Sequence, residues 1–234
     1  MDSTRYPPHV VERVTRNRGR LHAYRDLVAA RTALLVVDMQ TAFLAEGGPS
    51  EVPAARAIVP TINRLARTLR AAGGHVVWVV STYGPAESDR WRNLFDHVLG
   101  PEAGSRFRAA LSEGAEGHRI WPALEVRPAD PVVSKNRFSG FIGSRGRLER
   151  ELRGRGIDTL LVAGTVTNVC CESTAREAAM LDFRTIMVSD ANAGRAEEDD
   201  VRSYAVFLTA FGDVMSADEA LALLARGCPA ATAG

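Results

Sequence analysis

Length, composition and charge limit the interpretation of this chain before any motif is considered. Its 234 residues are 46% hydrophobic, 24% charged and 6% aromatic, a balance typical of folded globular proteins and unlike disordered or fibrous sequences. A chain of this length can form one large α/β domain with a single core. The formal net charge of +1 gives no general reason to expect nucleic acid or an anionic membrane as a partner.

The cysteines and the start of the chain bear on the compartment. Two of the three cysteines, Cys170 and Cys171, are adjacent and do not form a disulfide framework, so we expect a reducing, cytoplasmic environment. The first residues are polar and basic, and no stretch approaches the roughly 18 apolar residues that a transmembrane helix needs. The sequence therefore predicts neither secretion nor a membrane span.

The N-terminal segment, residues 1–30, is expected to form a helical arm. Residues 7–27 combine a thin stripe of valines with several arginines. A basic stripe can contact nucleic acid, but Glu12 and Asp26 dilute this one. We interpret it as the solvated face of a helix that lies across the core or across a neighbouring subunit.

From Thr32 onward, short β-branched runs alternate with longer helical stretches, which indicates βαβ units and a parallel sheet. The expected strands cover residues 32–38, 75–82, 131–135, 158–164, 184–190 and a short run near 214. The expected helices cover residues 52–72, 144–153, 169–181, 197–211 and a last one capped by Ser216. Between them, residues 83–131 are irregular, with short helices expected near 91–99 and 106–111.

This pattern predicts a three-layer α/β/α, Rossmann-like fold with a six-stranded, mainly parallel sheet. We expect one domain over residues 31–226 and a flexible tail at 227–234. In such sheets ligands bind outside the carboxyl ends of the strands, so polar residues that follow apolar runs are candidates for function.

Three such residues are Asp38, Lys135 and Cys170, which follow the first, third and fourth expected strands. Each has an ordinary explanation when taken alone. The aspartate can be a turn or cap residue, the lysine can be solvated, and the cysteine can be a small core side chain. Together they supply a carboxylate, a cation and a nucleophile at one edge of the sheet.

The motifs around these residues resemble those of the isochorismatase-like cysteine hydrolases. The resemblance runs through LLVVDMQTAF, KNRFSGF and AGTVTNVCCESTAREA and covers about residues 31–224. The G-x-x-T-N-x-C turn is the most specific of these motifs. Within the family, the chain is most similar to the branch of ureidoacrylate amidohydrolases and N-carbamoylsarcosine amidases.

The resemblance implies a catalytic triad in which Cys170 is the nucleophile, Asp38 the general base and Lys135 the cation that holds their charge in place. It also implies a cis peptide bond between Thr165 and Val166, with the amides of Val166 and Cys170 forming an oxyanion hole. A thiol at a helix start beside a lysine is expected to have a depressed pKa. The second cysteine of the pair is expected to pack in the core.

The same resemblance predicts the reaction, which is hydrolysis of a non-peptide C–N bond in a small amide or ureido compound through a thioester, with release of ammonia or an amine. No cofactor is expected. The stretch STYGPAESDRWRN after the second strand lacks the D-x-H metal pattern of nicotinamidases, and the five histidines are scattered, so we expect no metal. Relatives in the family are usually oligomeric, which predicts a dimer or tetramer.

The substrate-binding residues are less well specified. Side chains beside the catalytic motifs that we expect to line a pocket are Gln40, Phe43, Asn136, Phe138 and Phe141, of which Phe43 and Phe141 are almost as compatible with the core. Arg137 is a candidate for gripping a substrate carboxylate, although a solvated or intersubunit ion pair is the simpler interpretation.

Three alternatives remain open at this point. One is an isochorismatase-type hydrolase of another small metabolite, although the nucleophilic cysteine argues against vinyl-ether cleavage. Another is a thiol redox or sensor protein that uses Cys170 and Cys171, although adjacent cysteines form only a strained disulfide and no CxxC is present. The third is a non-catalytic binding module, although the glycine motifs of nucleotide sites are missing.

Overall fold

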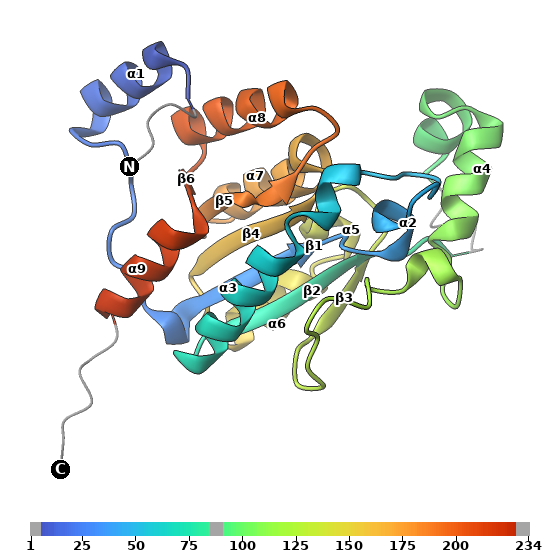
Figure 1. Ribbon diagram of the computed structural model, residues 1–234, viewed down its shortest axis with the longest axis horizontal. Coiled ribbons are helices and arrows are strands. Elements are labelled where there is room, and N and C mark those ends of the chain that lie inside the picture. Colours follow the sequence, from blue (N-terminus) through green and yellow to red (C-terminus); the bar gives the residue numbers. More distant parts are fainter. Residues whose placement is uncertain (1–5, 85–90, 228–234) are drawn as a thin grey trace.

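The centre of the molecule is a twisted parallel sheet with helices on both faces (Figure 1). The computed structural model describes residues 6–84 and 91–227, so most of the tail and the first five residues of the arm lie outside the described part. The six strands of the sheet are β1 (Thr32–Val37), β2 (His75–Ser81), β3 (Val132–Lys135), β4 (Thr159–Thr165), β5 (Arg184–Ala193) and β6 (Asp213–Met215). All strand pairs are parallel, so the predicted fold class is confirmed.

Helices precede, separate and follow the strands along the chain. The α-helices are α1 (Pro8–Arg18), α2 (Thr41–Leu44), α3 (Val59–Ala71), α4 (Pro101–Ala110), α5 (Gly140–Gly143), α6 (Arg147–Gly154), α7 (Glu172–Met180), α8 (Glu197–Ala210) and α9 (Ala217–Gly227). The shorter turns are η2 (Ala29–Arg31), η3 (Pro53–Arg56) and η6 (Glu116–His118), which are 3-10 helices, and η5 (Asn93–Val98) and η7 (Thr167–Cys171), which are π-helical.

The strand order is β3-β2-β1-β4-β5-β6, so the direction of winding reverses between β1 and β4. At such a switch point the two connecting segments leave the sheet in opposite directions and open a crevice at the carboxyl ends of the strands. Gly164 in β4 fits this junction, because a Cβ there would lie 2.1 Å from the carbonyl oxygen of Val37. A glycine therefore allows the ends of the two central strands to approach closely.

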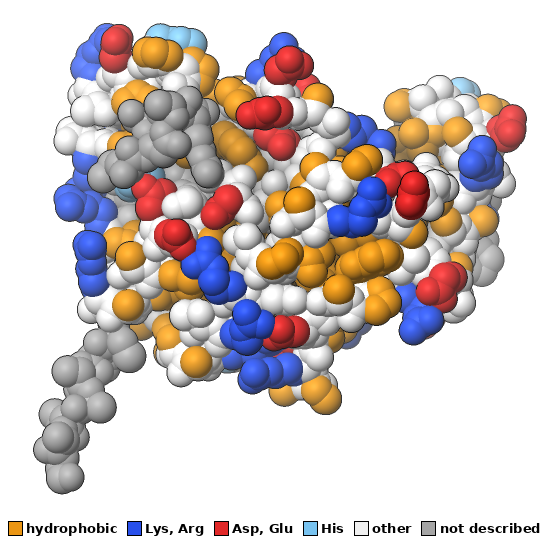
Figure 2. All heavy atoms as spheres, in the orientation of Figure 1, with side chains coloured by type: hydrophobic (Ala, Val, Ile, Leu, Met, Phe, Trp, Pro, Cys, Tyr) orange, Lys and Arg blue, Asp and Glu red, His pale blue; other side chains and the backbone are white. Residues whose placement is uncertain are grey.

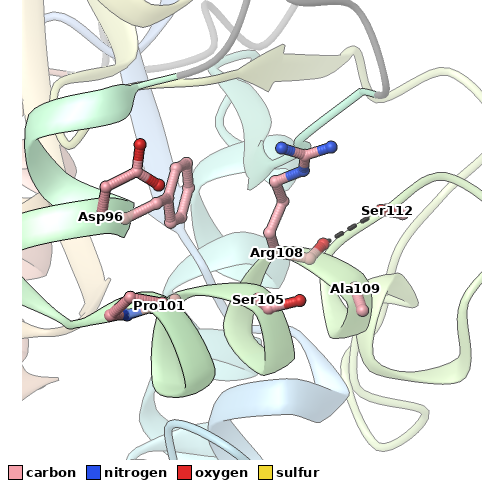
Figure 3. A pocket seen from close by; sticks show the side chains of 8 residues that line it. Asp96, Pro101, Ser105, Arg108, Ala109 and Ser112 are labelled. Atoms are coloured by element: carbon pink, nitrogen blue, oxygen red, sulfur yellow. Dashed lines mark hydrogen bonds between the residues drawn. The ribbon is translucent and has the colours of Figure 1, made fainter.

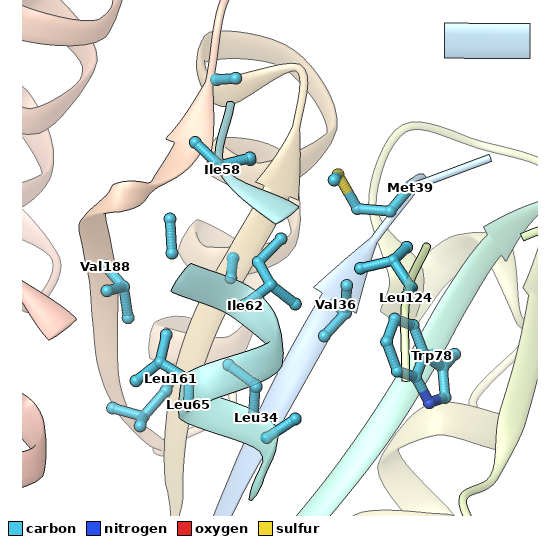
Figure 4. Close-up of a cluster of buried hydrophobic side chains, with 14 of the residues drawn as sticks. Leu34, Val36, Met39, Ile58, Ile62, Leu65, Trp78, Leu124, Leu161 and Val188 are labelled. Carbon is cyan, nitrogen blue, oxygen red and sulfur yellow. The ribbon is translucent and has the colours of Figure 1, made fainter. Parts of the chain in front are cut away.

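Alternate residues of the strands pack on opposite faces of the sheet. Leu34 and Val36 of β1 belong to a core cluster with α3 and α9, in which Ile62 and Leu65 of α3 lie over the central strands (Figure 4). The intervening residues of β1 face a second cluster with α6, α7 and α8. Both faces are thus covered, which explains why the strands are continuous apolar runs.

The N-terminal helix is shorter than the sequence predicts. It ends at Arg18 because Gly19 adopts a left-handed conformation (φ +70°) and donates its amide to the Thr15 carbonyl. The valines Val10 and Val14 are buried against α8 of the same chain. The arm therefore covers the second core cluster of its own subunit.

Local backbone features divide one other predicted helix and shorten a second. The expected helix over residues 52–72 is the turn η3 followed by α3, and a proline lies in the first turn of each. The expected helix from Ser144 begins only at Arg147, because Arg145 and Gly146 have positive φ angles. The last helix begins as predicted, since Ser216 and Glu219 form a capping box with reciprocal hydrogen bonds.

Figure 2 shows charges of both signs scattered over the drawn face, with hydrophobic side chains gathered near its centre. No part of this face is dominated by Lys and Arg, which agrees with the near-neutral net charge. Within residues 6–84 and 91–227, no helix is long and apolar enough to cross a membrane.

Candidate active site

The carboxyl ends of β1 to β4 bring together Asp38, Ser81, Lys135 and Cys170, which we call the rim. Asp38 follows β1 and Cys170 follows β4, so they flank the switch point of the sheet, and Lys135 ends β3. The lysine side chain reaches back across β2 to the aspartate, with 2.8 Å between Nζ and Oδ2. The three residues singled out from the sequence thus converge from separate parts of the chain.

Lys135 is held by three hydrogen bonds. Its ammonium donates to Asp38 Oδ2 at 2.8 Å, to Ser81 Oγ at 2.9 Å and to the Arg137 carbonyl at 3.1 Å. An ammonium has three protons, so all of them are accounted for. The residue is 1% exposed. Burial lowers the lysine pKa, but interactions led by the charge of the Asp38 carboxylate raise it by more, so the net direction is upward. Lys135 is therefore a fixed buried cation.

Asp38 is positioned by an unusual backbone. Its φ of +52° lies in the left-handed region, which non-glycine residues rarely adopt, and its amide donates to the Val79 carbonyl at 2.8 Å. Both carboxylate oxygens are buried. Oδ2 receives the Lys135 ammonium, while Oδ1 has no hydrogen-bond partner among the described residues. One oxygen of the pair is therefore available to receive a proton.

Cys170 lies in η7, in the turn that leads from β4 into α7, and is 5% exposed. Burial raises the pKa of its thiol, the charge of Asp38 raises it further, and Lys135 lowers it by a smaller amount. The net direction is upward, so the predicted depressed pKa is wrong. The reason is that loss of water costs the thiolate more than the nearby ammonium returns. The thiol is protonated until a base removes its proton.

Cys171 has a different environment. It is fully buried in the second core cluster with Ala175 and Ala178 of α7, and both cysteines are free thiols. Its packing is what the sequence predicts for the second member of the pair. The two adjacent cysteines therefore differ: Cys171 packs in the core, whereas Cys170 lines the cavity.

One expected backbone feature is present in the turn between β4 and α7. The peptide bond between Thr165 and Val166 is cis, and both Val166 and Cys170 form part of the wall of a cavity. The Cys171 amide donates to the Val166 carbonyl at 3.2 Å and closes the turn.

Thr174 connects this turn to the segment that follows Lys135. Its hydroxyl donates to the Cys170 carbonyl at 2.7 Å and accepts the Gly140 amide at 3.0 Å. Thr174 is fully buried. One side chain therefore links the backbone of the cysteine to the start of α5, five residues after Lys135 in the chain.

Of the rim residues, Cys170 lines a cavity of about 290 Å³, near the lower end of the size range of small-molecule sites. Besides Cys170 and Val166, the lining comes from α2, from the lobe formed by η5 and α4, and from the loops after β3, β4 and β5. The remaining lining residues are Phe43, Pro49, Ser50, Leu94, Leu99, Ala103, Phe107, Phe138, Val169 and Arg195.

The expected pocket residues divide into two groups. Phe43 and Phe138 line this cavity. Phe141 is instead buried in the second core cluster, with its ring 5.8 Å from that of Phe183. Asn136 lies just beyond the rim, where its backbone amide bonds to the Gly143 carbonyl at 3.1 Å.

Gln40 does not line the cavity, which corrects the sequence prediction. It is fully buried, and its amide group donates to the carbonyls of Ser81 and His118 at 3.0 and 2.8 Å. Its side-chain oxygen accepts the Ser81 amide at 2.8 Å. Both amide protons are used within the protein, so Gln40 is a clip that joins the ends of β1 and β2 to the loop at His118.

Arg137 makes contacts within its own chain. Its guanidinium lies 5.2 Å from the centre of the Trp91 ring and donates to the Asn136 carbonyl at 2.7 Å. Trp91 in turn packs edge-on against Phe138, with 4.7 Å between ring centres. The arginine therefore supports one wall of the cavity from behind.

Sequence reasoning missed Ser81 and Arg195. Ser81 ends β2, so the rule applied to the other strands also identifies it: a polar residue after an apolar run at the carboxyl end. Arg195 follows β5 by two residues and lines the cavity, where its Nη1 donates to the Glu51 carbonyl at 3.3 Å. It is the cationic side chain in the described wall of this cavity.

A second cavity, of about 490 Å³, lies on the other side of α4 (Figure 3). Its wall includes Asp96, Ser105 and Arg108, with Ser112 donating to the Arg108 carbonyl at 3.0 Å. None of the rim residues belongs to its described lining. The smaller cavity is thus the candidate active site, since it alone of these two reaches the cysteine.

A metal centre would need a cluster of suitable ligands. Over residues 6–84 and 91–227, no group of three or more His, Cys, Asp and Glu side chains is arranged to hold a metal ion. Two of the histidines have side-chain partners of another kind: His22 Nδ1 lies 3.0 Å from Asp213 Oδ1, and His118 Nε2 lies 2.8 Å from the Thr82 hydroxyl.

A doubly wound fold with a buried carboxylate, ammonium and thiol at its switch point defines a cysteine hydrolase type of site. Residues 32–219 match the model of the isochorismatase domain, and the chain belongs to this family of isochorismatase-like cysteine hydrolases. It is accordingly an isochorismatase-family hydrolase.

Individual relatives agree with this assignment. The ureidoacrylate amidohydrolase RutB of Methylorubrum extorquens is 34% identical over 217 residues, which span 82% of this chain and 86% of that protein. A cysteine hydrolase from Pseudomonas syringae pv. phaseolicola superimposes with a TM-score of 0.79 at 30% identity, covering 88% of this chain and 98% of that one. An isochorismatase family protein from Desulfovibrio vulgaris gives a TM-score of 0.72 at 31% identity, with 84% and 99% covered.

Proposed function

We propose that this protein is an amidohydrolase that cleaves a C–N bond other than a peptide bond in a small amide or ureido compound. The observation that carries the proposal is the buried arrangement of Asp38, Lys135 and Cys170, of which Cys170 lines a cavity large enough for a small metabolite. The similarity to ureidoacrylate amidohydrolases supports the substrate class.

In the first half of the reaction, the free Oδ1 of Asp38 takes the thiol proton as the Cys170 sulfur attacks the carbonyl carbon. The resulting oxyanion accepts hydrogen bonds from the amides of Val166 and Cys170. When the intermediate collapses, the C–N bond breaks and the proton on Asp38 passes to the leaving nitrogen. Ammonia or an amine departs, and a thioester remains on the sulfur.

In the second half, water gives a proton to Asp38 and adds to the thioester carbonyl. The C–S bond then breaks, and the sulfur recovers the proton from Asp38. An amide substrate yields a carboxylic acid, and a ureido substrate yields a carbamate. Lys135 keeps one oxygen of Asp38 occupied throughout, so that proton transfer takes place at the other.

Arg195 supplies a partner for an acidic substrate. Its side chain is exposed at the wall of the cavity, and among the described residues one of its five N–H donors has a partner, the Glu51 carbonyl. A guanidinium is well suited to a carboxylate, which it can bind through two parallel hydrogen bonds. We therefore propose that Arg195 binds the substrate carboxylate, a role for which the sequence had suggested Arg137.

The proposal is tested by ammonia release from a panel of ureido acids, primary amides and nicotinamide, with and without a chelator. Cys170→Ala should reduce turnover by at least about ten-thousandfold, since it removes the nucleophile. Cys171→Ala is the matched control, and it should keep turnover within about threefold because this thiol packs in the core. Full activity in folded Cys170→Ala contradicts the mechanism.

A further inference from the structure

The wall that η5 and α4 contribute to the Cys170 cavity is built from apolar side chains. Leu94 and Leu99 come from η5 and its end, and Ala103 and Phe107 come from α4. Ala103 and Phe107 are four residues apart and so lie on one face of α4. Within the described lining, the polar side chains are those of Ser50, Cys170 and Arg195. The lobe itself therefore contributes no polar side chain to this wall.

An aromatic cluster supports this wall from behind. Phe107 packs with Phe43 and Phe95, with ring centres 6.1 and 6.3 Å apart, and with Tyr83 at 5.7 Å. Tyr83 and Phe95 are also in edge-to-face contact at 5.0 Å. Rings packed in this way have few alternative rotamers, so the wall is preformed.

We propose that the substrate carries a branched aliphatic or aromatic substituent that packs against Leu94, Leu99 and Phe107 while Arg195 holds its carboxylate. The substrate class is then an N-carbamoyl or amide derivative of an apolar amino acid, in place of a small polar acid such as ureidoacrylate. This inference rests on the proposed function, because it places the scissile bond at Cys170.

The physical basis is the contrast between apolar and polar groups at such a wall. An apolar substituent loses unfavourable contact with water when it enters, and each additional methylene raises kcat/KM by roughly tenfold. A hydroxyl or carboxamide at the same place loses its hydrogen bonds to water and finds no side-chain partner on the lobe, which costs about tenfold to a hundredfold.

Isosteric substrate pairs test this contrast directly. We expect kcat/KM for N-carbamoyl-valine to exceed that for N-carbamoyl-threonine, and N-carbamoyl-leucine to exceed N-carbamoyl-asparagine, by at least about tenfold in each case. Each pair matches in shape and carboxylate, so Arg195 and Cys170 contribute equally to both members. Ureidoacrylate is included as the small polar reference.

A pair of substitutions on α4 locates the effect. Ala103→Leu places extra atoms in this cavity, and Ala109→Leu places the same atoms in the cavity on the other side of the helix (Figure 3). Both alanines are exposed, so neither change disturbs the core. Ala103→Leu should lower the ratio of kcat/KM for the leucine over the alanine derivative by about tenfold, and Ala109→Leu should leave this ratio unchanged.

The outcomes separate this inference from the proposed function. Cys170-dependent ammonia release that is fastest for ureidoacrylate, with polar and apolar isosteres hydrolysed equally and Ala103→Leu without effect, overturns the inference and leaves the amidohydrolase intact. No Cys170-dependent release from any compound overturns the proposed function, and the inference with it.

Discussion

Two parts of the molecule meet at the cavity, and they are built in opposite ways. The rim consists of charged and polar side chains at strand ends, buried and tied together by short hydrogen bonds from Lys135 to Asp38 and Ser81. The lobe of η5 and α4 presents apolar side chains to the cavity, and they are backed by aromatic rings in tilted and edge-to-face contact. The hydrogen bonds of the rim fix the positions of its polar groups, while the lobe forms an apolar surface of defined shape. We infer that the rim determines the reaction and the lobe determines the substrate.

The largest expected effect comes from the rim. Asp38→Asn keeps the shape of the side chain but cannot accept the thiol proton, so kcat should fall by about 10³ to 10⁴. The KM of an acidic substrate should change much less, because Arg195 is untouched. Steady-state ammonia release measures both constants. An Asp38→Asn enzyme with near-normal kcat would show that the rim does not transfer protons.

The next largest expected effect is a pH dependence of Cys170 alkylation, which follows from the raised pKa of this thiol. Since burial and Asp38 keep the thiol protonated, its reaction with iodoacetamide should accelerate by about tenfold per pH unit from pH 6 to 8, as the thiolate fraction increases. Mass spectrometry of the tryptic peptide identifies the modified cysteine, and Cys170→Ala shows the background from Cys171. A plateau at neutral pH contradicts a raised pKa and restores the prediction from the sequence.

A smaller effect is expected at Thr174, which joins the cysteine turn to the segment after Lys135. Thr174→Val preserves the shape but removes both hydrogen bonds and leaves the buried Gly140 amide without its partner. We expect a loss of about 1–3 kcal/mol in unfolding free energy and about a tenfold lower kcat with little change in KM. Thr174→Ser retains the hydroxyl and should recover kcat. Equal kcat in the two variants would exclude a positioning role.

The smallest effect is expected at His22 in the N-terminal arm, which belongs to neither the rim nor the lobe and so serves as a control for both. The hydrogen bond with Asp213, which is 3.0 Å from His22 Nδ1, raises the His22 pKa; the charges of Asp213 and Glu219 also raise it, while burial and Arg18 lower it. A raised folded-state pKa means that the stabilisation is complete below the unfolded value of about 6.5 and is lost as the pH rises through the folded value.

His22→Gln should therefore destabilise the protein by about 1–2 kcal/mol at pH 5.5 and by less at pH 9, with kcat unchanged. Urea unfolding at the two pH values measures the difference. A loss that does not depend on pH would mean that the His22 charge contributes nothing to the attachment of the arm.

The rim was largely predictable from the sequence, whereas the lobe was not. Asp38, Lys135 and Cys170 end or follow apolar runs whose period identifies them as strands, so the parallel topology alone brings them to one edge. Phe107 and Leu94 lie in a stretch with no such period, and nothing local shows which side of α4 faces the cavity. The thiol pKa could not be predicted because it depends on how completely water is excluded, which only the packed structure determines.

Gln40 is a second residue whose role could not be predicted from the sequence. Its place in the LLVVDMQTAF motif, two residues after Asp38, suggests a pocket residue, yet its partners, Ser81 and His118, are 41 and 78 residues away in sequence. Ser81, by contrast, obeys the strand-end rule and was predictable in principle. Long-range hydrogen-bond partners of a buried amide leave no periodic trace in the sequence.

The Gln40 clip has a consequence for the ammonium of Lys135. Two of the acceptors for that ammonium stand on different strands, Asp38 beyond β1 and Ser81 at the end of β2. A single carboxamide grips the backbone of Ser81 from both sides, and it is separated from Asp38 by one residue. Gln40 thereby fixes the distance between the Asp38 carboxylate and the Ser81 hydroxyl, so both acceptors are already in position for the Lys135 ammonium.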